Sequence, residues 1–258
     1  MGTALRTARG LASLIAVVLW FVVNAPLCYL VVLPAGTLWR TRRRLITSLF
    51  MRHMSRGILF LFRLGGARFT MRGRVPTHAP VLILMNHQSQ VDILFGTLMG
   101  EPYTPAFVPR RLYARWFIPL VAPSIWLLEC PVVDPRRDAK AALQAMREGQ
   151  RRQEHGLLIF PEGHRSTDGE VRPFRSAGTV ACLTERRTPV YLVVEDGLWE
   201  GRRFRDFLAN IPRLRGETDV LGPFEPPADD AALPAFVAEC RGRIVAHQKQ
   251  MREARGRV

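Results

Sequence analysis

The sequence contains almost no lysine and has no acidic residue in its first third. Only two of its 37 basic residues are lysines, and twelve arginines precede Asp92, the first acidic residue. The net charge is +15. So basic a chain fits nucleic acid, an anionic membrane surface or an anionic substrate. Because the acid-free part is also the most apolar part, its composition favours a membrane surface over nucleic acid.

The sequence also lacks the cysteine patterns of disulfide-rich and zinc-binding proteins. Its cysteines lie far apart, at Cys28, Cys130, Cys182 and Cys240. This spacing predicts buried thiols in a reduced compartment. No Gly-x-Ser-x-Gly motif occurs, so the serine nucleophile of an α/β-hydrolase is not expected. Without repeats or low-complexity tracts, 258 residues suffice for one sizeable catalytic domain.

Residues 11–33 form an almost wholly apolar run. As one helix this run would be about 35 Å long, enough to cross a bilayer. Asn24 and Pro26 favour a kink or a re-entrant hairpin as the alternative. Pro26 also disfavours cleavage as a signal peptide, because it follows the small-residue site and the apolar run continues beyond it. Arginines are denser after the run than before it, which predicts an inner-membrane protein whose remainder faces the cytoplasm.

Residues 45–62 place apolar side chains at helical spacing, with arginines between them. A basic amphipathic helix of this kind either lies in the membrane interface or packs on the soluble domain. We expect Gly65 and Gly66 to end it. The predicted division is therefore 1–66 for membrane-anchoring helices and 67–258 for a catalytic domain.

Strands and helices are expected to alternate beyond residue 67. Apolar runs predict strands at 69–71, 81–85, 106–108, 125–133, 157–160, 190–194 and 219–221. Helical spacing predicts helices at 91–99, 112–120, 137–153, 177–185 and 234–251, and the proline-rich 222–227 predicts a connector. This alternation indicates the α/β class, with a layered mixed sheet flanked by helices and an N-terminal membrane-associated helical segment.

Two strands are followed at once by polar, reactive side chains. The strand at 81–85 leads into His87, and Asp92 follows at the start of the next predicted helix. A histidine there can abstract a proton near neutral pH, and an aspartate can orient its ring. The same spacing also fits a loop histidine beside a helix-start aspartate without any chemistry.

The second such strand, at 157–160, is ended by Pro161 and followed by Glu162, Gly163, His164, Arg165 and Ser166. Here Gly163 allows close backbone approach to a ligand, and Arg165 offers bidentate binding of a phosphate. Arg110 likewise follows the predicted strand at 106–108. The alternative is a solvated connection in which Glu162 and Arg165 pair with each other.

These blocks resemble the signatures of the glycerolipid (lysophospholipid) acyltransferase family, the 1-acylglycerol-3-phosphate acyltransferases. Asn86-His87-Gln88-Ser89-Gln90-Val91-Asp92 resembles the first signature, and Phe160-Pro161-Glu162-Gly163-His164-Arg165-Ser166 resembles the Phe-Pro-Glu-Gly-Thr-Arg-Ser signature. Thr188-Pro189-Val190 is similar to the late proline block. The resemblance covers residues 67–226 and extends loosely to the N-terminal segment.

The chain departs from the family pattern at three places. His164 replaces the usual threonine, and Arg110 stands where lysine is common. Pro135 is inserted before Arg136 in the block Val132-Val133-Asp134-Pro135-Arg136, which approximates Phe-Ile-Asp-Arg. This insertion leaves open whether Arg136 or Arg137 has the family's role.

The resemblance implies transfer of a fatty acyl chain from a thioester to the hydroxyl of 1-acylglycerol-3-phosphate, which makes phosphatidic acid. His87 would act as general base with Asp92, and the implied substrate-binding residues are Arg110, Glu162, Gly163, Arg165 and Ser166. The donor would be acyl-CoA or acyl-acyl carrier protein, without a metal or redox cofactor. The implied partners are membrane lipids and the lysophosphatidic acid acceptor, and nucleic acid is not expected.

Alternatives remain at this point. His164 keeps open another acceptor: a different lysophospholipid, or an aminoacyl or glycosylated lipid. A membrane lipid-binding or scaffold protein with an unused catalytic pair is a rival of another class. A metal-dependent hydrolase using His87, Asp92, Glu162 and His164 is a further possibility.

Overall fold

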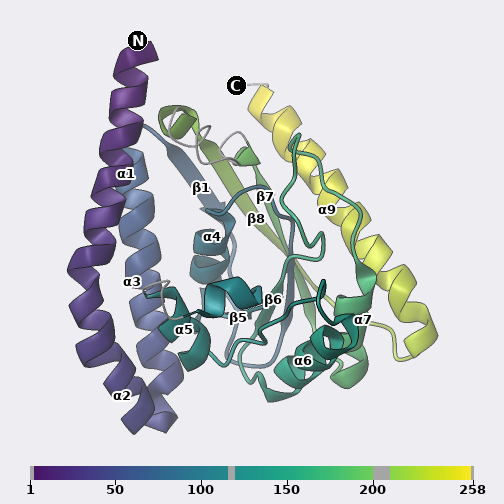
Figure 1. The fold of residues 1–258 in the computed structure, drawn as a ribbon. Coiled ribbons are helices and arrows are strands. Elements are labelled where there is room, and N and C mark those ends of the chain that lie inside the picture. The colour runs from purple at the N-terminus through teal and green to yellow at the C-terminus, as the bar shows by residue number, and fades with distance from the viewer. Residues whose placement is uncertain (1–2, 116–119, 200–209, 257–258) are drawn as a thin grey trace.

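The structure, a computed structural model, describes residues 3–115, 120–199 and 210–256. A mixed sheet with the strand order β1-β8-β7-β3-β6-β5 lies between two layers of helices (Figure 1). Its strands are β1 (Arg68–Arg72), β3 (Leu82–Met85), β5 (Ala106–Phe107), β6 (Leu157–Ile159), β7 (Val190–Asp196) and β8 (Arg215–Phe224). A separate pair joins β2 (Val75–Pro76) to β4 (Gly100–Glu101). The predicted α/β fold class is confirmed.

Strands β7, β3, β6 and β5 run parallel to one another, and β8 joins β7 in the antiparallel direction. The alternation of side chains in β3 explains why helices cover both faces. Leu82 and Leu84 enter one buried cluster, whereas Ile83 and Met85 enter the other. The parallel block therefore places the ends of four strands at one edge.

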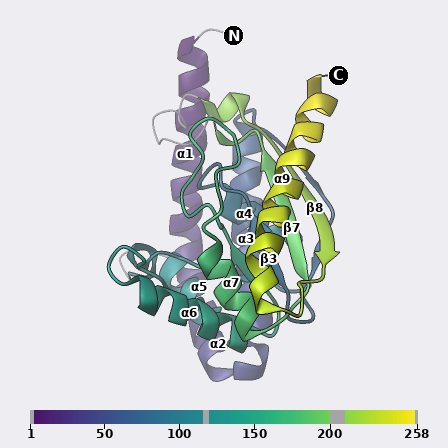
Figure 2. The ribbon, with the colours of Figure 1, turned by 90° about the vertical axis from the view of Figure 1, so that its right-hand side faces the viewer.

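One face of the sheet is covered by α6 (Ala139–Arg152), α7 (Ser176–Glu185) and α9 (Leu233–Gly256) (Figures 1 and 2). Asp138 begins α6 by accepting a hydrogen bond from Ala141 N at 2.8 Å, as an N-cap residue does. Cys240 and Ile244 of α9 and Leu183 of α7 are fully buried in this layer. The helices predicted at 137–153, 177–185 and 234–251 are thus confirmed, and α9 is longer than expected.

The opposite face is covered by α4 (Asp92–Met99) and by α3 (Arg43–Leu64), with α1 (Thr3–Pro26) packed outside α3. Buried side chains of α3 contact this layer, so the interpretation of 45–62 as a helix packed on the domain is confirmed; they are Phe50, Met54, Ile58, Leu59 and Phe62. Gly57 allows α1 to approach, because a Cβ there would lie 2.3 Å from the Trp20 ring.

The apolar N-terminal run continues past Pro26 as a π-helix, Leu27–Val32, and then as α2 (Leu33–Leu38). Pro26 cannot donate its backbone hydrogen bond, and the wider turn accommodates this loss within a continuous helical segment. Residues Leu5–Leu38 form a helical segment long and apolar enough to cross a membrane. Only 22% of its most apolar 18-residue stretch is buried. Most of this segment's apolar surface is therefore exposed.

Three sequence predictions need correction. The run at 125–133 is not a strand: α5 (Val121–Leu127) occupies its first part, and Val133 forms only an isolated bridge with Arg110. Pro123 lies in the first turn of α5, where proline is compatible with a helix. The helix expected at 112–120 is a short 3₁₀ turn at Arg111–Ala114, and its residues 116–119 lie outside the described part. Residues 222–224 belong to β8 instead of a connector.

Short helical turns complete the description: Arg40–Arg42, Ile211–Arg213 and Asp230–Ala232.

Candidate active site

The carboxyl ends of β3, β6 and β5 lie side by side because these strands are neighbours and parallel. His87 follows β3, Glu162 follows β6 and Arg110 follows β5. The sheet therefore brings together three polar segments that are far apart in the sequence, at the edge where α/β proteins commonly bind ligands.

His87 and Asp92 form a hydrogen-bonded pair. His87 Nδ1 lies 2.8 Å from Asp92 Oδ2, and the side chains are 22% and 0% exposed. The same Oδ2 accepts hydrogen bonds from Gln88 N at 2.6 Å and Ser89 N at 2.8 Å. Because an ionised carboxylate can only accept hydrogen bonds, Nδ1 is the ring nitrogen that donates to Asp92, and Nε2 is left for another partner.

The imidazole is fixed on its other side by Phe160. The two rings are stacked with centroids 4.2 Å apart and an interplanar angle of 26°. No hydrogen bond joins Nε2 to a described residue of the protein. His87 therefore presents a basic nitrogen that is available to a substrate hydroxyl.

Asp92 is the first residue of α4, where the helix dipole favours a negative charge. Its second oxygen, Oδ1, is buried and has no hydrogen-bond partner among the described residues. The fully buried Glu195, at the end of β7, is close enough for the charge of Asp92 to act on it. Burial first, and then the charge of Asp92, raise the pKa of Glu195 well above its usual range.

Glu162 connects the two polar segments instead of projecting freely into solvent. Its Oε1 accepts a hydrogen bond from His87 N at 2.7 Å, and its Oε2 accepts one from Arg172 N at 2.9 Å. Ser166 N also donates to His87 O at 2.7 Å. Burial raises the pKa of Glu162, while the two backbone N–H groups favour its ionised form. The Glu162 carboxylate therefore fixes the position of the His87 backbone relative to the loop that follows β6.

Gly163 and Arg110 meet beside this connection. Gly163 adopts a φ of +69°, which favours glycine, and its carbonyl accepts a hydrogen bond from Arg110 Nη2 at 2.8 Å. A Cβ at Gly163 would contact the Arg175 side chain at 3.3 Å. Arg110, predicted after β5, and Gly163, predicted after β6, are thus in direct contact.

A cavity of about 370 Å³ opens next to these residues, lined by Glu162, His164, Arg172, Pro173 and Arg175. Burial, followed by the positive charges of four arginines, lowers the pKa of His164; these are Arg110, Arg175, Arg136 and Arg172. Within the lining, Arg172 and Arg175 supply two positive charges against the one carboxylate of Glu162, so the cavity wall is cationic overall. Such a wall is suited to an anionic group.

The two remaining predicted residues lie in the same loop. Arg165 is half-buried, and its carbonyl accepts a hydrogen bond from Arg172 Nη1 at 3.4 Å. The Ser166 hydroxyl is buried, and its one O–H lies within hydrogen-bond distance of two acceptors in the loop, Asp168 Oδ1 at 3.0 Å and Glu170 O at 2.8 Å. It also accepts from Gly169 N at 3.0 Å. The Ser166 side chain thus shapes the loop that carries Arg165.

Sequence reasoning missed Arg172 and Arg175, which contribute two of the cavity's cations. The available signal was the stretch Arg172-Pro173-Phe174-Arg175, directly after the second polar block. Arg175 makes no hydrogen bond or ion pair with another described residue through its side chain. It therefore offers a guanidinium that a ligand can engage.

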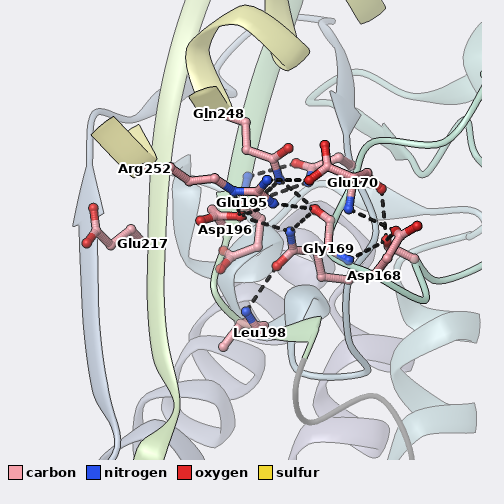
Figure 3. Close-up of polar contacts among 12 residues, drawn as sticks. Asp168, Gly169, Glu170, Glu195, Asp196, Leu198, Glu217, Gln248 and Arg252 are labelled. Atoms are coloured by element: carbon pink, nitrogen blue, oxygen red, sulfur yellow. Dashed lines mark hydrogen bonds and ion pairs between the residues drawn. The ribbon is translucent and has the colours of Figure 1, made fainter. Parts of the chain in front are cut away.

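Sequence reasoning also missed a buried polar network behind the site. Figure 3 shows Gln248 and Arg252 extending from α9 toward Asp196 and Gly169. Asp196 Oδ1 accepts from Gln248 Nε2 at 3.1 Å, from Arg252 Nη2 at 2.9 Å and from Gln88 Nε2 at 3.2 Å. Gln88 also donates to Gly169 O at 3.0 Å. The network joins the residue after His87, the loop after Ser166 and the last helix.

The residues proposed for a metal-dependent hydrolase do not form a ligand cluster. Within residues 3–115, 120–199 and 210–256, no three His, Cys, Asp or Glu side chains are grouped so as to hold a metal ion. The oxygens of Glu162 instead accept backbone N–H groups.

Comparison with known proteins agrees with this geometry. The acyltransferase family model matches residues 67–194. The lyso-ornithine lipid O-acyltransferase of Rhodobacter capsulatus is 30% identical over 203 residues, which cover 69% of each protein. The 1-acyl-sn-glycerol-3-phosphate acyltransferase of Pseudomonas aeruginosa is 29% identical over 122 residues, or 46% of each protein. This second match spans less than half of either chain.

A solved structure has the same fold. The 1-acyl-sn-glycerophosphate (LPA) acyltransferase PlsC from Thermotoga maritima superimposes with a TM-score of 0.72, covering 95% of this chain and 98% of the other, at 20% identity. The family match, the curated relatives and the fold agree with one another. The chain therefore belongs to the acyltransferase family and is an O-acyltransferase of the lysophospholipid acyltransferase type.

Proposed function

We propose that this protein transfers a fatty acyl chain from a thioester to the free hydroxyl of 1-acylglycerol-3-phosphate, and so makes phosphatidic acid. The observation that carries the proposal is the group of arginines at the cavity beside Glu162: Arg172 and Arg175 line it, and Arg110 donates to the Gly163 carbonyl next to it. A phosphate monoester offers two negative charges and several oxygens to such a group. The donor is acyl-CoA or acyl-acyl carrier protein.

His87 is the general base in this reaction. Its Nε2 takes the proton of the acceptor hydroxyl while that oxygen attacks the thioester carbonyl carbon. The carbon–sulfur bond then breaks, and the departing thiolate takes the proton back from His87. Asp92 holds the ring through Nδ1 and stabilises its protonated form. The 2.8 Å contact between His87 Nδ1 and Asp92 Oδ2 supports these roles.

The other predicted site residues position the acceptor. Glu162 and Gly163 form the wall beside the glycerol, and Arg110, Arg165 and Arg175 bind the phosphate. Ser166 supports the loop from within. General-base help supplies about 10²–10⁴-fold, and positioning must supply much of the remaining acceleration. The cationic cavity is thus the source of both affinity and orientation.

A lyso-ornithine lipid is the second candidate acceptor. The relative from Rhodobacter capsulatus is aligned with 69% of this chain, against 46% for the relative from Pseudomonas aeruginosa. Ornithine carries a carboxylate, which arginines bind as they bind phosphate. It also carries an ammonium group, which Arg172 and Arg175 of the lining would repel and which has only the Glu162 carboxylate there to attract it. The charge of the cavity therefore favours the phosphate acceptor.

The protein works at a membrane surface in this proposal. The exposed apolar face of α1 and the bacterial membrane-lipid acyltransferases among its relatives support this placement. We propose the cytoplasmic side of the inner membrane, with residues 1–66 providing the attachment and 67–258 the catalytic part. The acceptor and the product would then remain in the lipid layer throughout.

The test uses the full chain purified in detergent. It is supplied with labelled oleoyl-CoA or oleoyl-acyl carrier protein and with one of three acceptors: 1-acylglycerol-3-phosphate, lyso-ornithine lipid or uncharged 1-acylglycerol. His87→Ala is the matched inactive variant. Product from the phosphate acceptor, absent with His87→Ala, is the expected result.

Each other outcome changes the proposal in a defined way. Product mainly from lyso-ornithine lipid would replace the phosphate acceptor with the aminoacyl one. Equal rates with uncharged 1-acylglycerol would remove the role of the arginines. Thioester consumption unchanged by His87→Ala would remove the general base.

A further inference from the structure

A second cavity lies on the outer side of α1 and α3, apart from the active site. Its volume is about 470 Å³, and its lining includes Trp20, Arg52, His53, Arg56, Gly57 and Phe60. Arg52 donates to the carbonyl of Gly100, just beyond the last residue of α4. Asp92 begins the same helix, about 12 Å away along its axis. The α1–α3 cavity is therefore at the end of α4 opposite to the catalytic pair.

Two arginines that form no ion pair with a described carboxylate line this cavity. Arg52 and Arg56 lie one turn apart on α3, where like charges repel each other. Arg56 is exposed, and its side chain forms no hydrogen bond or ion pair with a described residue. None of the described residues that line the cavity carries a carboxylate. The charge of Glu101 acts on Arg52, but Glu101 pairs with Arg74 at 3.6 Å. The described lining therefore holds cations without an anion.

Two buried donors at the same place also lack acceptors. Neither Trp20 Nε1 nor Arg52 Nε has a hydrogen-bond partner among the described residues, although both atoms are buried. By contrast, His53 Nε2 lies 2.9 Å from Asn24 Oδ1, so that side chain is satisfied. Buried donors without acceptors are costly in a folded protein. An oxygen-rich ligand in the cavity would supply the missing acceptors.

The surroundings of the cavity identify the kind of ligand. Leu49 and Phe60, which line it, are 60% and 57% exposed, and the neighbouring α1 presents Val18, Val22 and Val23 to the surface. An apolar surface interrupted by arginines and a tryptophan matches the boundary between headgroups and acyl chains. A free anion would contact the cations but leave this apolar surface uncovered.

We propose that the α1–α3 cavity binds the phosphate of an anionic membrane phospholipid, whose acyl chains lie along the exposed apolar side chains of α1 and α3. This inference rests on the membrane placement in the proposed function, and it does not depend on which acceptor the active site uses. The bound lipid fixes how deeply, and with which rotation, the α1–α3 pair sits in the bilayer.

The experiment measures binding of short-chain lipids to the full chain in a nonionic detergent. Dihexanoyl-phosphatidylglycerol, dihexanoyl-phosphatidylcholine and inorganic phosphate are titrated by calorimetry below their micellar concentrations. Arg56→Gln removes the exposed cation of the cavity, and Trp20→Phe removes the indole N–H together with part of the ring system. Arg42→Gln is the matched control, because Arg42 is exposed in the same basic region but does not line the cavity.

We expect saturable binding of phosphatidylglycerol, weakened at least tenfold by Arg56→Gln and several-fold by Trp20→Phe, and less than twofold by Arg42→Gln. An equal loss with Arg56→Gln and Arg42→Gln would mean diffuse surface charge and would overturn the site. Equal affinity for phosphatidylcholine would overturn the requirement for net anionic charge. Inorganic phosphate binding as tightly as the lipid would overturn the lipid assignment.

Activity in detergent separates this inference from the proposed function. Arg56→Gln should keep wild-type turnover with a monomeric acceptor, since the cavity is remote from His87. A wild-type protein inactive with every acceptor would contradict the proposed function, while the lipid titration would still decide the second site.

Discussion

Asn86 and Glu195 are joined by two hydrogen bonds that connect the ends of β3 and β7. Asn86 Nδ2 donates to Glu195 O at 2.8 Å, and Glu195 N donates to Asn86 Oδ1 at 2.7 Å. The asparagine side chain thereby continues the ladder of the sheet by one step after β3 has ended. The backbone of His87, the next residue, starts from this fixed point.

Replacing Asn86 by Ala should reduce both stability and turnover. Glu195 N would lose its acceptor, and Glu195 O would keep only the longer bond from Gln248 Nε2 at 3.4 Å, at a cost of about 1–3 kcal/mol. The His87 backbone would also lose its support, so kcat should fall more than KM rises. Chemical denaturation and steady-state kinetics measure the two effects. Gln90→Ala, at an exposed position of the same turn, is the control and should change neither.

His87→Ala should abolish transfer while leaving the melting temperature near that of the wild type, because the side chain is partly exposed. Asp92→Asn should lower kcat by about 10³–10⁴-fold, as expected when the orienting carboxylate of a catalytic histidine is lost. Single-turnover assays with labelled donor measure both variants. Near-normal turnover in either one would contradict the assigned general-base pair.

Arg175→Gln should weaken binding of the phosphate acceptor by about 10- to 100-fold, the effect of losing one charge-assisted contact. The substitution removes no hydrogen bond between described residues. Initial rates with 1-acylglycerol-3-phosphate and with uncharged 1-acylglycerol distinguish a loss of phosphate binding from a general loss of activity. Arg165→Ala should likewise act mainly on phosphorylated acceptors, and Lys140→Gln on α6 serves as a control for net charge. A parallel loss with both acceptors would argue against phosphate binding.

Glu195 should make the protein less stable as the pH rises. Its pKa is raised in the folded state above the ordinary value of 4.5, so folding favours its protonated form. That contribution is complete below about pH 4.5 and is lost as the pH rises through the folded-state pKa. Glu195→Gln keeps an acceptor for Thr218 but cannot ionise. Melting temperatures from about pH 5 to pH 9 should fall for the wild type relative to this variant; parallel curves would refute the inference.

Much of the fold was predictable because its strands are continuous apolar runs. The runs at 81–85, 157–160 and 190–194 are the buried parallel strands β3, β6 and β7. The run at 125–133 was equally apolar but became α5 and an extended segment, since an apolar run without periodicity fits either structure. For β8, glycine and proline near both ends hid most of a ten-residue strand.

The candidate site was predictable only where function follows a strand directly. His87, Glu162 and Arg110 could be placed together because the ends of parallel strands meet. The meeting of Asp196 with Gln88 and Arg252 depends on how α9 packs across the sheet, which no local pattern encodes. Arg175 was missed for a similar reason: its loop returns to Gly163 by tertiary contacts.

The burial of α3 matters for anyone who wants a water-soluble version of this enzyme. Cutting the chain before residue 67 would remove Phe50, Ile58, Leu59 and Phe62 from the interior, so the remainder should aggregate instead of simply leaving the membrane. Redesign should keep both helices and exchange exposed residues of α1, such as Val18, Val22 and Val23, for polar ones. The helix α3 thus belongs both to the membrane-attachment segment and to the folded interior. Only the outward side of α1 is free for engineering.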